Sequence, residues 1–201
     1  MKFFLLLLLG ILTACGTENT QNQQTNTQQD QQAPVQIDYL QKGEEITTQT
    51  QTALLKTVSK AIAEKGTDGA VEYCNLKALS IVDSLSKANN CQIRRVSDKY
   101  RNPQDKAQNA IEEKALQTFL EKYQKQEKLE PFTLQEGKEI YYFKPIMLGM
   151  ETCLKCHGEK NKEIEPKTLA VIQKLYPNDL AHGYKLKDFR GMWAVKFNVE
   201  R

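Results

Sequence analysis

Apolar residues over positions 37–63 are mostly three or four apart toward the end of that stretch. This pattern predicts a long amphipathic helix that ends at Gly66. Thr67 and Asp68 can cap a second helix, whose apolar residues again lie near one face. Cys74 is on that face, so we expect its side chain to point inward. The apolar positions of the two helices are Leu40, Ile46, Leu54, Leu55, Val58, Ala61 and Ile62, then Ala70, Val71, Cys74, Ala78, Ile81 and Val82.

The middle of the chain predicts a short strand and a third helix. The strand covers residues 93–96, and Asn102-Pro103 breaks the chain after it. Residues 104–128 return to helical spacing. The apolar positions on the buried side of this helix are Ile111, Leu116, Phe119, Leu120 and Tyr123.

From Pro131 onward the chain becomes mostly extended. Residues 132–134, a turn at Glu136-Gly137 and residues 140–148 predict a β-hairpin. Residues 166–175 predict a helix that starts at Pro166 and is stopped by Pro177. The last segment predicts a half-buried strand, with Trp193, Val195, Phe197 and Val199 facing one way and Ala194, Lys196 and Asn198 facing the other. Helices first and an antiparallel sheet later indicate an α+β fold.

The N-terminus has the pattern of an exported bacterial lipoprotein. Lys2 gives a positive start, residues 3–12 form an apolar run, and small residues precede Cys15. The run is shorter than the roughly 20 residues that cross a bilayer. Leu12-Thr13-Ala14-Cys15 looks like a lipobox, in which Cys15 receives a diacylglyceryl group and becomes the mature N-terminus. We therefore expect residues 1–15 to direct export and to anchor the protein by lipid on the periplasmic or cell-surface side of a membrane.

Composition separates a tether from a folded domain. Residues 16–36 are almost wholly Gln, Asn, Thr and acidic residues, which cannot bury enough apolar surface to fold, so we expect a disordered tether. Residues 37–201 suffice for one domain. The chain is 40% hydrophobic and 26% charged, which is typical of a globular protein. A net charge of only +3, with lysines and acids interspersed, argues against a nucleic-acid partner.

The candidate chemistry is concentrated in Cys153-Leu154-Lys155-Cys156-His157, a C-x-x-C-H sequence typical of c-type haem attachment. Two thiols separated by two residues can add to the two vinyl groups of haem, and the adjacent histidine can bind the iron. This attachment takes place outside the cytoplasm, so the export signal supports it. We expect one covalent haem c, bound through Cys153 and Cys156 and ligated by His157.

Cys153 and Cys156 have three alternative interpretations besides haem attachment. A thioredoxin-like pair normally opens a helix early in a βαβ pattern, which this sequence lacks. A structural zinc site would need a fourth good ligand and often a second paired motif. A plain disulfide is the third alternative.

Spacing alone leaves the second iron ligand open. Of the five cysteines, Cys74 and Cys91 have no assigned role; they can pair, or Cys74 can offer a thiolate to iron while Cys91 stays buried. The other histidine, His182, lies in a turn-like stretch typical of an exposed loop. Three methionines complete the set of candidates: Met147, Met150 and Met192.

Five further motifs accompany the C-x-x-C-H sequence: Tyr73-Cys74-Asn75, Ile93-Arg94-Arg95-Val96-Ser97, Lys99-Tyr100-Arg101-Asn102-Pro103, Tyr142-Phe143-Lys144-Pro145-Ile146 and Phe189-Arg190-Gly191-Met192-Trp193-Ala194-Val195. In this order they resemble the PAS-like c-type haem domain family, a bacterial domain of unknown function found alone or fused to sensor kinases. The resemblance spans about residues 39–199. It implies a PAS-like fold, a single covalent haem, and His157 and Cys74 as axial ligands. One departure is Leu79, where members often have proline.

Arginines near the motifs are candidates to hold the haem propionates, because a guanidinium can bind a carboxylate through two hydrogen bonds. These candidates are Arg94, Arg95 and Arg101, together with Tyr100. A solvated position is the alternative for each of them.

Cys/His ligation suits a redox or diatomic-gas sensor, because a thiolate favours ferric iron and reduction weakens its bond. The sequence contains no kinase or cyclase segment, so we expect the signal to pass to a separate redox or signalling protein. The alternative is an electron-transfer cytochrome that its lipid holds near a membrane-associated redox partner. A peroxidase-like enzyme would need acid–base residues beside an open iron position, and His182 is the sole spare histidine. We therefore predict no catalytic residue.

Overall fold

The protein is described by a computed structural model over residues 37–198. The predicted signal peptide (residues 1–15) with its lipidated Cys15, the predicted tether (residues 16–36) and Val199 lie outside the described residues. Among the helices of the described part, none is both long enough and apolar enough to cross a membrane.

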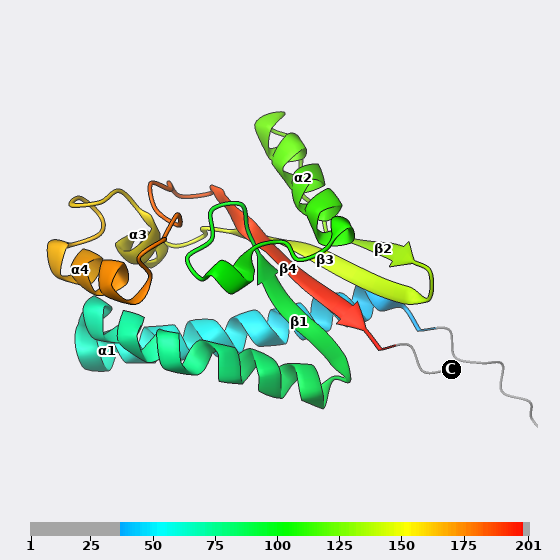
Figure 1. Ribbon diagram of the computed structural model, residues 1–201, viewed down its shortest axis with the longest axis horizontal. Coiled ribbons are helices and arrows are strands. Elements are labelled where there is room, and N and C mark those ends of the chain that lie inside the picture. The colour runs from blue at the N-terminus through cyan, green and yellow to red at the C-terminus, as the bar shows by residue number, and fades with distance from the viewer. Residues whose placement is uncertain (1–36, 199–201) are drawn as a thin grey trace, which may run out of the picture. The chain divides into compact units, whose positions relative to one another are not determined.

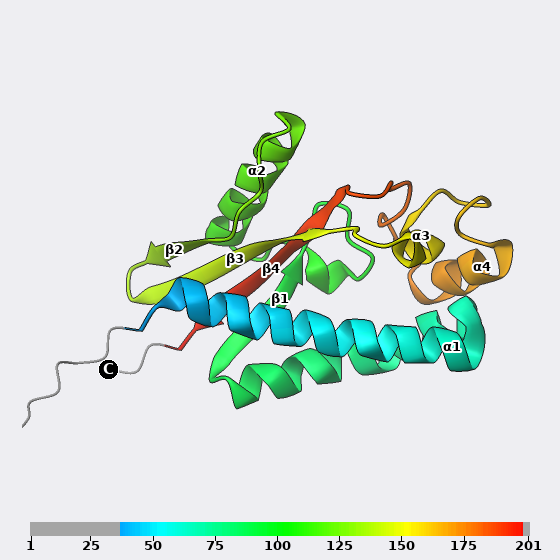
Figure 2. The same ribbon diagram turned by 180° about the vertical axis from the view of Figure 1, so that it is seen from behind.

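Helix α1 (Tyr39–Ala88) is interrupted at Gly66, as the sequence predicts. Gly66 has φ 73° and ψ 178°, a conformation that breaks the helix and that glycine adopts without a steric penalty. The helix begins where the Asp38 side chain accepts hydrogen bonds from the backbone N–H groups of Leu40 and Gln41. The two limbs of α1 run side by side in both ribbon views (Figure 1, Figure 2).

Four strands form one antiparallel sheet in the order β1-β4-β3-β2. They are β1 (Cys91–Val96), β2 (Phe132–Glu136), β3 (Glu139–Met147) and β4 (Phe189–Phe197). The predicted hairpin is β2 and β3, and β4 pairs with both β3 and β1. Together with the helices, this sheet confirms the α+β class and is consistent with a PAS-like fold.

In the inner strand β4, Trp193, Val195 and Phe197 face one side and Ala194 faces the other, as predicted, but both sides are covered, so the prediction of a half-buried strand is wrong. Trp193 and Val195 belong to a core cluster that they share with Ile46 of α1. Ala194, on the other face, packs in a second cluster with Phe119 of α2 (Ala110–Gln124). The prediction failed because the small side chain of Ala194 occurs on exposed as well as buried faces, so it does not indicate in the sequence that α2 covers it. The sheet is therefore enclosed between α1 and α2 (Figure 1).

The third helix is shorter than the predicted span of residues 104–128. A short 3₁₀ turn (Pro103–Asp105) comes first, and α2 begins only after Asn109, whose side chain accepts a hydrogen bond from the backbone N–H of Glu112. Arg94 donates to the backbone carbonyls of Gln104 and Lys106 at 2.8 and 3.0 Å. Because those carbonyls bind a guanidinium, this stretch takes an irregular path before α2.

Two short helices lie beside the bend of α1 (Figure 2). Helix α4 (Pro166–Leu175) has the predicted bounds, and its Leu169 and Ile172 pack against Val71 of α1. Helix α3 (Glu151–His157) is not among the elements predicted from periodicity, because seven residues are too few to establish a pattern. It contains the whole C-x-x-C-H sequence.

The pairing of β3 with β4 contains a bulge. Ile146 pairs with Gly191 and Met147 pairs with Phe189, so Arg190 has no partner in the register. Phe189 consequently packs on the same side of the sheet as Ala194. Arg190 is turned to the opposite side, away from α2.

We predict that Gly191→Ala lowers the free energy of unfolding by about 2 kcal/mol or more. Gly191 has φ 146°, and a Cβ there would lie 2.5 Å from the carbonyl oxygen of Val96. Urea unfolding of the purified protein measures the loss. Gly137→Ala is the control, because Gly137 also has a positive φ of 59° but an added Cβ would meet nothing within 4 Å. Equal losses for the two variants would contradict the steric argument.

Candidate functional site

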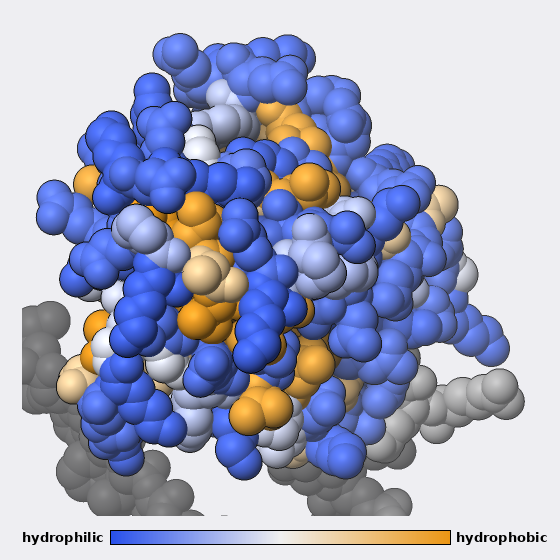
Figure 3. All heavy atoms as spheres, turned by 60° about the vertical axis from the view of Figure 1, so that its left-hand side comes forward, coloured by the Kyte–Doolittle hydropathy of each residue, from blue (hydrophilic) through white to orange (hydrophobic). Residues whose placement is uncertain are grey.

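A cavity of about 500 Å³ lies between α1, α3 and the adjoining ends of β1, β3 and β4. Its α1 wall is mostly apolar, with Gln51 and Asn75 as polar exceptions, and its larger apolar residues are Leu54, Leu55, Val58, Ile62 and Val71. Polar and charged groups gather at another part of the lining, including Arg95, Arg101, Asp105 and Arg190. Orange apolar side chains are visible between polar ones on the face turned forward in Figure 3.

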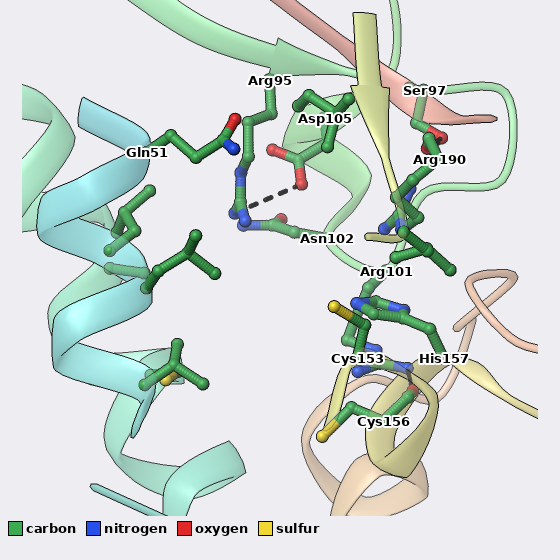
Figure 4. A pocket seen from close by; sticks show the side chains of 18 of the residues that line it. Gln51, Arg95, Ser97, Arg101, Asn102, Asp105, Cys153, Cys156, His157 and Arg190 are labelled. Atoms are coloured by element: carbon green, nitrogen blue, oxygen red, sulfur yellow. Dashed lines mark hydrogen bonds and ion pairs between the residues drawn. The ribbon is translucent and has the colours of Figure 1, made fainter. Parts of the chain in front are cut away.

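Helix α3 presents the C-x-x-C-H residues together. Cys153, Cys156 and His157 are at positions i, i+3 and i+4, which lie on one face of a helix. All three line the cavity, and the two sulfur atoms point into it toward α1 (Figure 4). The predicted grouping of two thiols and an imidazole is therefore present.

The tautomer of His157 follows from its hydrogen bond. Nδ1 lies 2.8 Å from the carbonyl oxygen of Ala181. A carbonyl oxygen only accepts, so Nδ1 carries the hydrogen and Nε2 keeps its lone pair. Burial, and then the nearby Arg190 and Arg101, hold the pKa of His157 well below its usual value. The side chain is a neutral imidazole whose free nitrogen can bind a metal.

Arg101 fastens the segment that carries Ala181 to the end of α3. Its Nη2 donates to the carbonyl oxygens of Cys156 at 2.6 Å and of Ala181 at 3.2 Å. Its guanidinium also forms an ion pair with Asp179 at 3.1 Å. Two backbone bonds complete the connection, from the N–H of Gly183 to Gly158 and from the N–H of Tyr184 to His157. Arg101 also lines the cavity. Because of these bonds, most of its hydrogen-bond donors are already used within the protein.

Cys74 lines the cavity from α1, so the inward orientation expected of it is present. Burial raises the pKa of the Cys74 thiol, and the positive charge of Arg95 opposes this shift. The four cysteines of the described residues have free thiols, so Cys74 and Cys91 do not form the disulfide that the sequence left open. Cys91 instead packs in the core at the start of β1, where burial raises its pKa to about 11.

The structure divides the other candidate iron ligands. Met147 and Met150 line the cavity. Met192 is fully buried in the core under α2, on the other side of the sheet. His182 is absent from the cavity lining, and its backbone carbonyl accepts a hydrogen bond from Lys99 at 2.7 Å.

Two residues predicted to hold propionates lie outside the cavity lining: Arg94 and Tyr100. Arg94 faces α2 and pairs with the buried carboxylate of Glu112 at 2.8 Å. Tyr100 accepts a backbone hydrogen bond from Leu180 through its carbonyl. Alternation along β1 could have separated Arg94 from Arg95, which does line the cavity beside Asp105 (Figure 4).

The sequence analysis did not single out Arg190 or give Ser97 a role, yet both line the cavity. Arg190 donates from Nη1 to Ser97 Oγ at 2.8 Å. Strict alternation from Trp193 would place Arg190 on the α2 side, and the bulge at Gly191 reverses this. A glycine within a strand is the signal that could have indicated a bulge.

The metal-binding side chains in the cavity are too few to hold a bare metal ion, but they suit a metal that is already bound in a cofactor. Among residues 37–198, no group of three or more His, Cys, Asp or Glu side chains could hold a metal ion, which disfavours the zinc alternative. One imidazole, one thiol from α1 and an apolar wall match a flat macrocycle that itself occupies most coordination positions. The cavity volume is also within the range of about 300–1,000 Å³ found for small-molecule and cofactor sites.

Comparisons with known proteins identify similar chains. The model of the Tll0287-like family matches residues 19–198. The crystal structure of the cyanobacterial heme-protein Tll0287 is similar to this chain, with a TM-score of 0.62 and 29% sequence identity. That match covers 79% of this chain and 93% of the other. No curated protein matches the chain.

We predict that Arg101→Gln destabilises the protein by about 3 kcal/mol, because it leaves Asp179 and two carbonyls without their cationic partner. Thermal and urea unfolding measure the effect. Lys128→Gln is the control, since the Lys128–Glu130 pair is exposed and solvent screening leaves it with little effect on stability. A loss for Arg101→Gln no larger than that of the control would show that Arg101 does not fasten this segment.

Proposed function

Since the chain belongs to the Tll0287-like family, we propose that it is a c-type haem protein that senses redox state or a diatomic gas. The similarity to a cyanobacterial heme-protein supports haem binding. The observation that carries the proposal is the cavity of about 500 Å³ that Cys153, Cys156 and His157 line from one face of α3. Bound haem would supply a one-electron redox centre and a coordination position for a small gas molecule.

The side chains of α3 hold this group in the proposal. Cys153 and Cys156 would hold the haem through thioether bonds to its vinyl groups, and His157 would bind the iron through Nε2. The carbonyl of Ala181 keeps the proton on Nδ1 and orients the ring, as outer-shell acceptors commonly do for metal-bound histidines. The apolar wall from α1 excludes water from the faces of the ring.

Cys74 is the proposed second axial ligand. Among the described cysteines, it is the one that lines the cavity from α1, whereas the other two cavity thiols belong to α3. A thiolate ligand favours ferric iron and lowers the reduction potential. Cys74 belongs to α1 and His157 to α3. A change in the ligands of the iron would therefore change the contacts of both helices. This coupling is why we favour a sensor.

Electron transfer is the second candidate, and the rim of the cavity favours it. Leu55, Leu79, Met147 and Met150 line the cavity and are still 37–45% exposed. Apolar side chains gathered around a redox centre can form a contact surface for a partner protein. Spectra of the reduced protein with CO or NO separate the two functions: rapid gas uptake supports sensing, whereas indifference to gas with fast reversible oxidation supports electron transfer.

The N-terminal sequence adds a location to the proposal. Residues 1–15 would direct export, and lipid on Cys15 would hold the domain at the outer side of a bacterial membrane. The lipobox sequence before Cys15 supports this. The partner would then be a separate redox or signalling protein that reaches the same membrane surface.

We predict that the mature protein, produced in a cell with cytochrome c maturation machinery, carries the mass of one haem and of a lipidated Cys15. Mass spectrometry and the pyridine haemochrome assay on denatured protein measure this. The double variant Cys153→Ser/Cys156→Ser should lose the haem, whereas Cys91→Ser should keep it, because Cys91 packs in the core at the start of β1. A wild-type protein without a haemochrome signal would contradict the proposed function.

Cys74→Ser should shift the ferric Soret band, because an alcohol replaces the thiolate on iron. Absorption spectra of the oxidised protein detect the shift, and Cys91→Ser is again the matched control. If the Cys74→Ser spectrum equals that of the wild type, Cys74 is not an iron ligand.

A further inference from the structure

Four arginines lie near the cavity, and they differ in how fully their N–H donors are used. A guanidinium has five such donors. Arg94 donates to the carboxylate of Glu112 and to two backbone carbonyls. Arg101 donates to the carboxylate of Asp179 and to two other backbone carbonyls. Arg95 is paired with Asp105 at 3.5 Å.

Arg190 is the exception. Among the described residues it has no carboxylate partner, and its side chain makes one hydrogen bond, from Nη1 to Ser97 Oγ. Its other donors form no further hydrogen bond within residues 37–198, and the Tyr184 hydroxyl is the other polar group close to the guanidinium. A partly buried cation with unused donors favours a bound anion.

The backbone holds Arg190 in this position. The bulge at Gly191 turns the side chain toward the cavity, and Ser97 fixes both ends of the residue. The Ser97 hydroxyl donates to the carbonyl oxygen of Arg190 at 2.9 Å and accepts from its guanidinium at 2.8 Å. Gly191 permits the close approach of β1 that brings Ser97 there.

A second donor without a partner lies beside it. The hydroxyl of Tyr184 is buried and makes no hydrogen bond within the described part of the chain. The Tyr184 ring is 5.6 Å from the Arg190 guanidinium carbon and 4.2 Å from the Lys99 ammonium nitrogen. A tyrosine hydroxyl carries its hydrogen at neutral pH, so it can donate to an anion.

The position of Arg190 in the cavity and the charge of the lining favour a carboxylate of the haem itself as the bound anion. In Figure 4, Arg190 and Ser97 lie at the opposite end of the cavity from Cys156. Vinyl groups and propionates occupy opposite edges of a haem, so a ring fastened at the two cysteines directs its propionates toward that end. Of the three arginines in the lining, Arg95 is paired with Asp105 and Arg101 with Asp179, so the charge of Arg190 is left to balance one propionate.

We propose that Arg190, oriented by Ser97 and assisted by Tyr184, binds a haem propionate. This inference rests on the proposed function and assigns to Arg190 the role that the sequence predicted for Arg94, Arg95, Arg101 and Tyr100. The planar guanidinium binds the carboxylate through two parallel hydrogen bonds. Its positive charge also stabilises the reduced site, opposing the effect of the Cys74 thiolate.

The test compares holoprotein variants by resonance Raman spectroscopy and by redox titration. Arg190→Gln should shift the propionate bending bands and lower the reduction potential. Arg190→Lys should retain most of the potential but still shift the bands, because an ammonium keeps the charge without the two-point contact. Ser97→Ala should shift the bands in the same direction by less, and it provides a second measurement if Arg190→Gln yields little protein.

Lys128→Gln is the control, since it also removes one positive charge but Lys128 is exposed and lies outside the cavity lining. Its propionate bands should stay at the wild-type positions. Wild-type bands in both Arg190→Gln and Ser97→Ala would overturn this proposal while leaving haem attachment intact. A wild-type protein without a pyridine haemochrome signal would overturn the proposed function itself, so the two failures are distinguishable.

Discussion

The hydrogen bond between Nδ1 of His157 and the carbonyl oxygen of Ala181 decides what the cavity can do. It leaves Nε2 as the free nitrogen and fixes the direction of the imidazole. It also connects α3 to a segment 24 residues further along the chain. Arg101 binds the same carbonyl, the end of α3 and Asp179, so a single guanidinium from beyond β1 keeps the histidine and its acceptor together.

The sheet supplies the opposite end of the site through an irregularity. Regular alternation in β4 would place Arg190 under α2, where the core is apolar. The bulge allows Phe189 to enter that core and turns Arg190 outward to the cavity. The same strand therefore contributes apolar packing to both faces of the sheet and a cation to the site. Gly191 makes this possible because β1 approaches too closely there for any side chain.

Local patterns predicted the elements and the central motif, and tertiary contacts determined the rest. Helical spacing identified both limbs of α1, and the spacing within the C-x-x-C-H sequence identified Cys153, Cys156 and His157 as a group. The start of α2 was not predicted, because Arg94 on β1 binds two backbone carbonyls in the segment before the helix, which is a contact between residues distant in the sequence. Arg190 was not predicted to face the cavity, because the pairing register of β3 with β4 shows where the bulge falls, and Arg94 was misassigned because its partner Glu112 lies in a different element.

The exposure of the cavity rim gives a physical reason for covalent attachment. Leu55 and Leu79 on α1, and Met147 and Met150 before α3, keep between a third and a half of their surface exposed while lining the cavity. Such a site buries only part of a flat apolar cofactor, so hydrophobic burial alone stabilises the complex weakly. In the proposed haem complex, two thioether bonds would prevent the haem from dissociating. A site held in this way can keep one edge accessible to a gas or a redox partner, which an enclosed pocket could not.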